Sequence, residues 1–165
     1  MTPFDRCLSV VLGHEGQDTI TDDPRDPGGL TRWGISAASH PGVDIRNLTR
    51  EGAADIYRRD YWQPLRCDEL PLPIALCVFD CGVNQGVNTA VRLLQSVIGA
   101  QIDGTFGPRT LMAVFRSPVE QLTRRFMTAR LHKYMSLGHW HTYGRGWGAR
   151  VLDVAMTAAE WNQPE

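Results

Sequence analysis

The sequence contains no apolar run long enough to cross a bilayer. Its longest runs, such as residues 8–13 and 74–79, fall far short of the roughly 20 residues that a membrane-spanning helix needs. Met1 is followed by Thr-Pro-Phe-Asp, with neither the basic nor the apolar segment of a classical export signal. We therefore expect a protein that is made in the cytoplasm without a signal peptide and that has no transmembrane segment.

The chain also lacks an excess of charge of either sign. Its formal net charge is −1, with 17 Lys and Arg against 18 Asp and Glu. Proteins that bind polyanions usually carry a strongly basic patch or stripe. The composition therefore gives no support to nucleic-acid binding, and we expect no nucleic-acid partner.

Metal-binding motifs are absent as well. The four cysteines form no paired C-x-x-C motif, and His14-Glu15 lacks the second histidine of H-E-x-x-H. Cys77 and Cys81 would face one side of a helix, which favours small, buried apolar side chains. A core of this size does not require disulfides, and the sequence leaves open whether any cysteines pair. We expect neither a metal nor another cofactor.

What the sequence does contain is the pattern of a helical globular domain. With 165 residues, 42% of them hydrophobic and 21% charged, the chain is large enough for one domain with its own core. Apolar residues recur at helical spacing, and no stretch is rich in strand patterns. Helices are expected over about residues 4–15, 50–62, 74–86, 89–99, from 108, 118–137 and 149–161, with a loop over 138–147. The predicted fold is mainly α, with a small loop or β-hairpin lobe after the first helix.

Glu15 lies on the same helical face as the predicted core. The apolar stripe before it has the i, i+3, i+4, i+7 spacing of a helix with one buried face: Phe4, Cys7, Leu8 and Val11. At about 100° per residue, position 15 falls within roughly 20° of position 8, so the carboxyl group points the same way. Glycines at 13 and 16 predict that the helix ends here, where partial burial and the helix dipole favour the protonated carboxyl. Such a group suits a general acid, and an ion pair with Arg32 or another arginine is the alternative.

A polar, turn-rich segment follows, from Gln17 to Ile35. Its run D-D-P-R-D-P-G-G, residues 22–29, cannot form a regular helix, because proline fixes φ and glycine favours turns. We expect a tight loop with a short β-hairpin. Because the segment directly follows Glu15, its aspartates, Thr31 and Trp33 are candidates for the same site.

These motifs, in this order, resemble glycoside hydrolase family 108, which comprises lysozyme-like N-acetylmuramidases of phages and bacteria. The first half carries H-E-G-x(9)-D-P-G-G-x-T-x-x-G-I from His14, and then I-Y-R-R-D-Y-W from Ile56. The second half resembles the peptidoglycan-binding region that usually follows, in residues 80–86, Leu94-Gln95, D-G-x-F-G-P-x-T from Asp103 and G-W-G-x-R-V from Gly146. The resemblance covers about residues 4–155 and departs at Gln17, where the family commonly has glycine.

The resemblance implies a lysozyme-like fold in one compact domain, residues 1–165. A catalytic segment would occupy about residues 1–87, and a helical, peptidoglycan-binding-like segment of about residues 88–160 would pack on it.

The resemblance also implies catalytic roles. Glu15 would protonate the leaving oxygen, a second carboxylate would act as base or nucleophile, and Thr31 would help to position water. Asp26 is the predicted second carboxylate, because its place between Glu15 and Thr31 is similar to the glutamate–aspartate–threonine arrangement of phage-type lysozymes. Asp22 and Asp23 compete with it. Alternatively, Asp26 only shapes a turn, Thr31 only starts a strand, and Glu15 acts with water held by hydroxyl and backbone groups.

Four residues are candidates for substrate binding. The aromatic rings of Trp33 and Tyr61 can stack on sugar faces, although aromatic residues at helical spacing are more often part of a core. Asn84, beside glycines at a helix end, can hydrogen-bond an N-acetyl group or simply cap the helix. Asp80 can touch sugar or pair with an arginine.

The sequence thus predicts an N-acetylmuramidase that cleaves the β-1,4 bond between N-acetylmuramic acid and N-acetylglucosamine in peptidoglycan. The alternatives are a lytic transglycosylase and a non-catalytic module that binds peptidoglycan or assists secretion. The expected partner is the glycan strand, and the expected state is a monomer. A phage endolysin released by a holin and a secreted bacterial effector with an immunity protein fit equally, both acting in the periplasm or cell wall.

Overall fold

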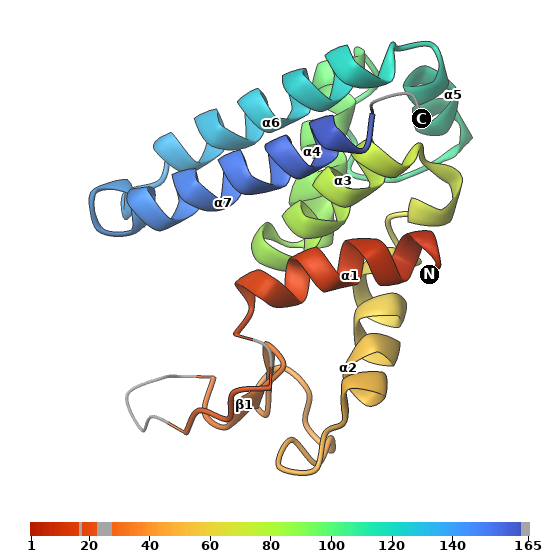
Figure 1. The fold of residues 1–165 in the computed structure, drawn as a ribbon. Coiled ribbons are helices and arrows are strands. Elements are labelled where there is room, and N and C mark those ends of the chain that lie inside the picture. Colours follow the sequence, from red (N-terminus) through yellow and green to blue (C-terminus); the bar gives the residue numbers. More distant parts are fainter. Residues whose placement is uncertain (17, 23–27, 163–165) are drawn as a thin grey trace. The chain divides into compact units, whose positions relative to one another are not determined.

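The computed structural model describes residues 1–16, 18–22 and 28–162. The chain forms two compact units, Met1–Asp60 and Tyr61–Glu165 (Figure 1). The predicted catalytic segment, about residues 1–87, therefore takes in the first unit and the start of the second. The single-domain arrangement stays a prediction.

The first unit begins with helix α1 (Pro3–His14). Thr2 caps it in a capping box, in which the Thr2 hydroxyl accepts from the Asp5 N–H and the Asp5 carboxylate accepts from the Thr2 N–H. The stripe predicted from the sequence is buried, together with Leu12. This packing explains why a 12-residue helix forms here and fixes which way its last turn faces.

A small β-hairpin follows in the same unit. Strands β1 (Thr31–Arg32) and β2 (Ile35–Ser36) pair antiparallel, with Thr31 opposite Ser36 and Arg32 opposite Ile35. The two connecting residues, Trp33 and Gly34, have φ values of 55° and 73°. Positive φ at both central residues is the signature of a type I′ turn, whose twist matches that of the strands. The predicted hairpin lobe is confirmed.

Helix α2 (Arg50–Tyr57) starts at Thr49, whose hydroxyl accepts from the Gly52 N–H. It continues directly into a π-helical turn, η1 (Arg58–Trp62), so the helix predicted over residues 50–62 is present with a widened end. π-helical turns are rare and occur often at functional sites.

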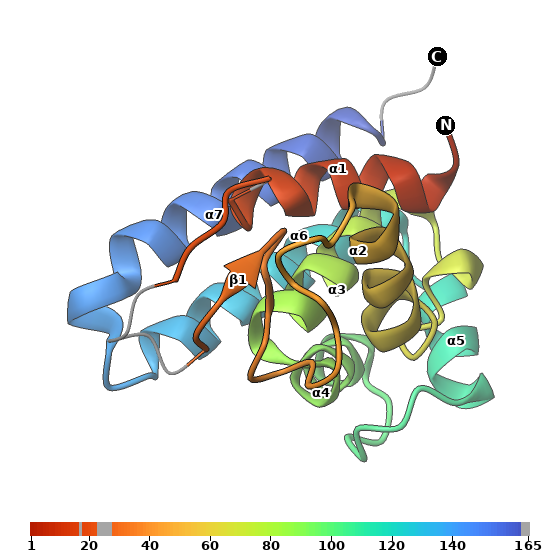
Figure 2. The ribbon, with the colours of Figure 1, turned by 90° about the horizontal axis from the view of Figure 1, so that it is seen from below.

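The second unit is a bundle built around helix α3 (Leu72–Gln85), in which residues 73–82 are all buried. A helix that is apolar on every side must be covered on every side. Here α3 packs against α4 (Val87–Ile98), α6 (Val119–Met135) and α7 (Trp140–Glu160), with α6 and α7 side by side (Figures 1 and 2). The short η2 (Cys67–Glu69) precedes α3, and α5 (Pro108–Phe115) follows α4. The fold is mainly α and lysozyme-like, as predicted.

The loop predicted over residues 138–147 is wrong, because α7 already begins at Trp140. Three glycines, at 144, 146 and 148, lower the local helix propensity and suggested a loop. Tertiary packing outweighs that propensity: Trp147 stacks on Tyr134 of α6, with ring centroids 4.9 Å apart and an interplanar angle of 18°. An added Cβ at Gly144 would lie 2.7 Å from the Trp140 ring, so this glycine makes room for that side chain.

All four cysteines are buried thiols, which for Cys77 and Cys81 is what the sequence favoured. Burial raises the pKa of the Cys7 and Cys81 thiols to about 12, so both stay protonated at neutral pH. In the described ranges, no helix is long and apolar enough to span a membrane. The same residues contain no group of three or more His, Cys, Asp or Glu side chains placed to hold a metal ion.

Candidate active site

Glu15 stands at the carboxyl end of α1. Its N–H donates to the Val11 carbonyl at 3.1 Å, and its backbone (φ −90°, ψ 7°) leaves the helical path there. The side chain is half-buried, and its Oε1 atom is buried. Glu15 therefore follows the last residue of α1, where the sequence predicted the end of the helix.

The hairpin turn packs directly on the stem of Glu15. A Cβ built on Gly34 would lie 2.8 Å from Glu15 Cβ and 2.6 Å from the Tyr57 hydroxyl oxygen. Both distances are shorter than real Cβ contacts allow, so only glycine lets the turn approach this closely. The glycine therefore brings the turn, Glu15 and Tyr57 of α2 together inside the first unit.

Two hydrogen bonds anchor the turn. The Tyr57 hydroxyl donates to the Trp33 carbonyl at 2.9 Å, and the Trp33 indole N–H donates to the Leu48 carbonyl at 3.2 Å. These bonds hold Trp33 at a positive φ that a bulky residue rarely adopts. Trp33 is thus a structural anchor of the site, and its stacking on sugar stays a prediction.

Gly34→Ala tests this packing. We expect it to destabilise the protein by about 2–4 kcal/mol, because it combines an unfavourable positive φ with overpacking. If Glu15 is the catalytic acid that the sequence predicts, activity should also fall by about 10–100-fold, since a displacement of a catalytic group by about 1 Å is costly. Thermal unfolding and hydrolysis rates, measured well below the transition, give the two effects.

Gly42→Ala is the matched control. Gly42 has a φ of 96° in the same unit, and an added Cβ there would meet nothing within 4 Å. Gly42→Ala should lower the stability, because alanine disfavours the positive φ, but it should leave the reaction rate unchanged. If the two variants hydrolyse at similar rates, the contact between Gly34 and Glu15 does not position the acid.

The arginine that the sequence offered as a partner for Glu15 bonds elsewhere. The Arg32 guanidinium contacts Asp18 at 2.6 Å and donates to the Arg46 carbonyl at 2.7 Å. Arg46 in turn pairs with the exposed Asp22 at 3.1 Å. Asp22, one candidate for the second carboxylate, is therefore paired on the surface of the unit.

Asp26, the predicted second carboxylate, lies outside the described residues, as do Asp23 and Gln17. Its role stays a prediction. Thr31 begins β1, and its N–H and carbonyl both pair with Thr21, at 2.8 and 2.9 Å. The Thr31 hydroxyl donates to the Gly29 carbonyl at 3.1 Å, and its oxygen can still accept a hydrogen bond from water.

The sequence patterns did not single out Tyr57, Leu48 or His40. Tyr57 had a signal, because it belongs to the I-Y-R-R-D-Y-W motif that begins at Ile56. The His40 Nε2 atom lies 3.0 Å from Asp60 in η1. A hydrogen bond from Arg59 lowers the pKa of the Asp60 carboxyl group, and a second hydrogen bond, with His40, lowers it further.

Two of the predicted sugar-binding residues lie on α3, in the second unit. Asp80 is fully buried, its carboxylate lying 2.6 Å from Arg130 and 2.7 Å from Arg150. This is the arginine pairing that the sequence left open, and a carboxylate enclosed in this way joins α3, α6 and α7 rather than facing solvent. Asn84 is exposed at the end of α3, where it accepts a hydrogen bond from the Tyr134 hydroxyl. Tyr61 is half-buried in η1.

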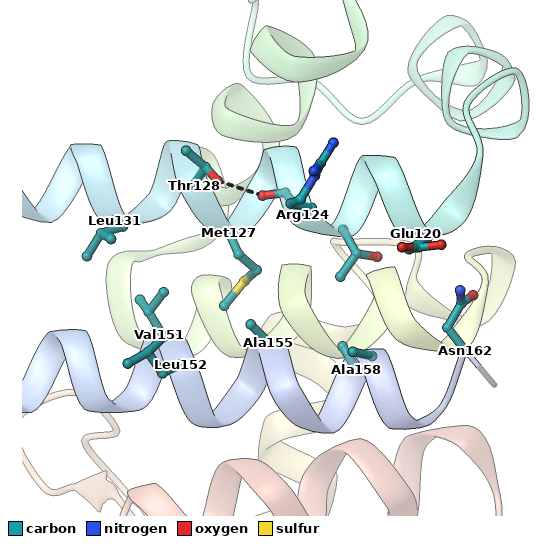
Figure 3. A pocket seen from close by; sticks show the side chains of 12 residues that line it. Glu120, Arg124, Met127, Thr128, Leu131, Val151, Leu152, Ala155, Ala158 and Asn162 are labelled. Atoms are coloured by element: carbon teal, nitrogen blue, oxygen red, sulfur yellow. Dashed lines mark hydrogen bonds between the residues drawn. The ribbon is translucent and has the colours of Figure 1, made fainter.

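An apolar pocket of about 360 Å³ opens between α6 and α7 (Figure 3). Met127, Val151, Leu152 and Ala155 point into it, and Glu120 and Arg124 are among its polar residues. Glu120 is the only carboxylate among the described residues that line it. Most of its lining is apolar and none of the predicted catalytic residues is part of it, so this pocket is not the candidate active site.

Comparison with known proteins identifies the family of the chain. The family model described as Glycosyl hydrolase 108 matches residues 8–86, a range that contains Glu15, the hairpin and Tyr57. Among solved structures, SagA of Brucella abortus is similar to the chain at 32% identity and a TM-score of 0.86, over 98% of this chain and 97% of that one. A comparison with curated proteins finds no match.

Proposed function

The chain belongs to glycosyl hydrolase family 108, and from this membership we propose that it is an N-acetylmuramidase. The family makes it a glycoside hydrolase of the lysozyme-like, peptidoglycan-cleaving type. The proposed bond is the β-1,4 linkage between N-acetylmuramic acid and N-acetylglucosamine. The observation that carries the proposal is the half-buried Glu15 at the end of α1, against which the Trp33–Gly34 turn is packed.

In the proposed mechanism Glu15 protonates the oxygen of the leaving sugar. Glu15 directly follows the last residue of α1, and its Oε1 atom is buried. The hydrogen bonds from Tyr57 and to Leu48 keep the turn rigid, so the acid is held in place before the reaction. This preorganisation is what an oxocarbenium-like transition state requires.

Hydrolysis also needs a group that activates or replaces water. We assign this role to Asp26, with Thr31 positioning the water through its hydroxyl oxygen. A carboxylate about 5–5.5 Å from the acid would act as a nucleophile, and one about 6.5–9.5 Å away would act as a base. Asp22, Asp23 and water held by Thr31 alone are the alternatives.

The products released by the wild-type protein test this proposal. Purified peptidoglycan would be digested, reduced with borohydride and analysed by mass spectrometry. We expect fragments that end in reduced N-acetylmuramic acid, because hydrolysis creates a reducing end at that sugar. Anhydro ends would instead identify a lytic transglycosylase, and an absence of fragments from folded protein would leave a non-catalytic module.

We further propose that the protein acts on glycan strands in the periplasm or cell wall. Release by a holin, as for a phage endolysin, and delivery as a secreted bacterial effector both fit this site of action. An immunity protein is a partner that only the second setting requires.

A further inference from the structure

The apolar pocket of about 360 Å³ between α6 and α7, the α6–α7 groove, contains a buried hydroxyl group. Thr123 of α6 lines the groove and is 6% exposed, and its Oγ1 atom forms no hydrogen bond with any described residue. Thr128 and Thr157, in the same two helices, donate to the carbonyls four residues before them, at 2.9 and 3.0 Å. Buried polar groups normally have such a partner, so the Thr123 hydroxyl is a candidate contact for a ligand.

The wall of the groove is apolar, and part of it faces solvent. Met127 points from α6 toward α7, and Val151, Leu152 and Ala155 line the opposite side (Figure 3). Leu152 is 64% exposed, and Met156, about one turn further along α7, is 65% exposed. The groove is within the size range of ligand pockets, about 300–1,000 Å³. Its size and its lining suit a flexible apolar chain.

A second hollow, of about 450 Å³, borders the other side of α6 and is basic. Its residues include Arg124, Arg125 and His132, all exposed, and its described lining contains no carboxylate. The two hollows share Arg124 and Thr128, and the Arg124 side chain extends away from α7 in Figure 3. Only one ridge of α6 therefore separates a basic site from an apolar groove.

We propose that the two hollows together bind one anionic phospholipid, with an acyl chain in the α6–α7 groove and the phosphate on Arg124 and Arg125. Guanidinium groups bind phosphate oxygens through charge-assisted, often paired hydrogen bonds. The Thr123 hydroxyl, one residue from Arg124, can donate to the ester carbonyl that joins the chain to the headgroup. Glu120, the carboxylate of the groove, lies at its end beside Asn162 (Figure 3).

The charges thus favour an anionic headgroup on the basic side of α6 and a chain on the other side. Such a contact attaches a protein reversibly to a membrane surface, because buried methylene groups and basic side chains both contribute. The inference does not depend on the proposed hydrolysis.

The first measurement is calorimetric titration of the full chain with lauroyl lysophosphatidylglycerol below its critical micelle concentration. Lauroyl lysophosphatidylcholine is the probe with the same chain and no net charge, and glycerol 3-phosphate is the probe without a chain. We expect saturable binding of the first probe and roughly tenfold or more weaker binding of the other two. Equal affinity for the choline lipid would identify a groove for any apolar chain, and equal affinity for glycerol 3-phosphate an anion site alone. Either result would overturn the proposal.

Two pairs of variants test the two ends of the site. Ala155→Phe fills the groove, and its control is Ala149→Phe, at an exposed position of the same helix that does not line the groove. Arg125→Gln removes a phosphate contact, and its control is Arg116→Gln, at an exposed arginine that lines neither hollow. We expect the test variants to weaken binding of the glycerol lipid by roughly tenfold, and the controls to change it less than about twofold.

Thr123→Val provides a test that does not add bulk to the groove. Valine has nearly the same shape, and removal of a buried hydroxyl without a partner should not lower the melting temperature. We expect about fivefold weaker binding, the effect of one lost hydrogen bond. Wild-type affinity in both Thr123→Val and Arg125→Gln would contradict the proposed contacts.

Sedimentation with vesicles tests whether a bilayer supplies the lipid. We expect the chain to sediment with phosphatidylglycerol vesicles and to stay in solution with phosphatidylcholine vesicles. Protein that stays in solution with both would overturn the proposal. Self-association of the lipid-free chain that Ala155→Phe abolishes would overturn it as well, and would identify the groove as a contact between two copies.

Discussion

Glu15→Gln is expected to slow the release of reducing ends from purified peptidoglycan by about 10²–10⁴-fold, the usual contribution of a general acid. Glutamine has nearly the same shape, so the packing of the Trp33–Gly34 turn on the side-chain stem should survive. It has no acidic proton to give to the leaving oxygen. The measurement is the initial rate of release of borohydride-reducible ends, with unfolding curves to show that the variant folds.

Glu51→Gln is the control for this change. Glu51 is an exposed glutamate in the first turn of α2, in the same unit as Glu15, and its replacement should leave the rate unchanged. A rate for Glu15→Gln within tenfold of that control would remove Glu15 from the role of acid. The same assay on Asp26→Asn then locates the second group, because retained activity would move that role to Asp22, Asp23 or water held by Thr31.

The position of Glu15 could be predicted because it depends on local information. A repeating apolar stripe sets the buried face of α1, and the glycines at 13 and 16 set its end. The approach of Gly34 to Glu15 could not be predicted in the same way. It depends on a type I′ turn that places a tryptophan at positive φ, against the preference of that residue.

What stabilises that turn lies far away in the sequence. Tyr57 is 24 residues from Trp33, and Leu48 is 15 residues from it. No local pattern links these positions, so only the fold reveals that they form one site. At the start of α7 a local pattern led to a wrong prediction. Its glycines favoured a loop, but the stacking of Trp147 on Tyr134 helps to hold a helix there.

Asp80 shows how a motif can mark stability instead of contact with substrate. The sequence placed it at the end of an apolar helix, beside Asn84, where an acidic residue suggests a site. Its two partners, Arg130 and Arg150, lie 50 and 70 positions further along the chain, and nothing local predicts which arginines reach it. The single carboxylate bridges two guanidinium groups inside the second unit and offsets part of their charge where an uncompensated charge is costly.

Asp80→Asn is therefore expected to destabilise the protein by about 3–5 kcal/mol, because it removes the carboxylate charge that lies against the buried guanidinium groups of Arg130 and Arg150. The measurement is the free energy of unfolding from denaturant titrations. Glu69→Gln is the matched control. It removes the carboxylate of a partly exposed pair in which Arg66 binds Glu69 through two nitrogens, each at 2.6 Å, and it should leave the unfolding curve almost unmoved.

The pH dependence of that difference identifies its cause. Burial alone would raise the pKa of Asp80, but the charges of Arg130 and Arg150 hold it below its ordinary value. A carboxyl group whose folded-state pKa is lowered stabilises the protein fully above its unfolded value of about 4 and loses that contribution as the pH falls through the lowered pKa. The difference in the free energy of unfolding between wild type and Asp80→Asn should therefore be constant from pH 8 to about pH 5. It should shrink only in stronger acid. A gap that narrows already near neutral pH, or one no larger than that of Glu69→Gln, would mean that the three charges do not hold α3, α6 and α7 together.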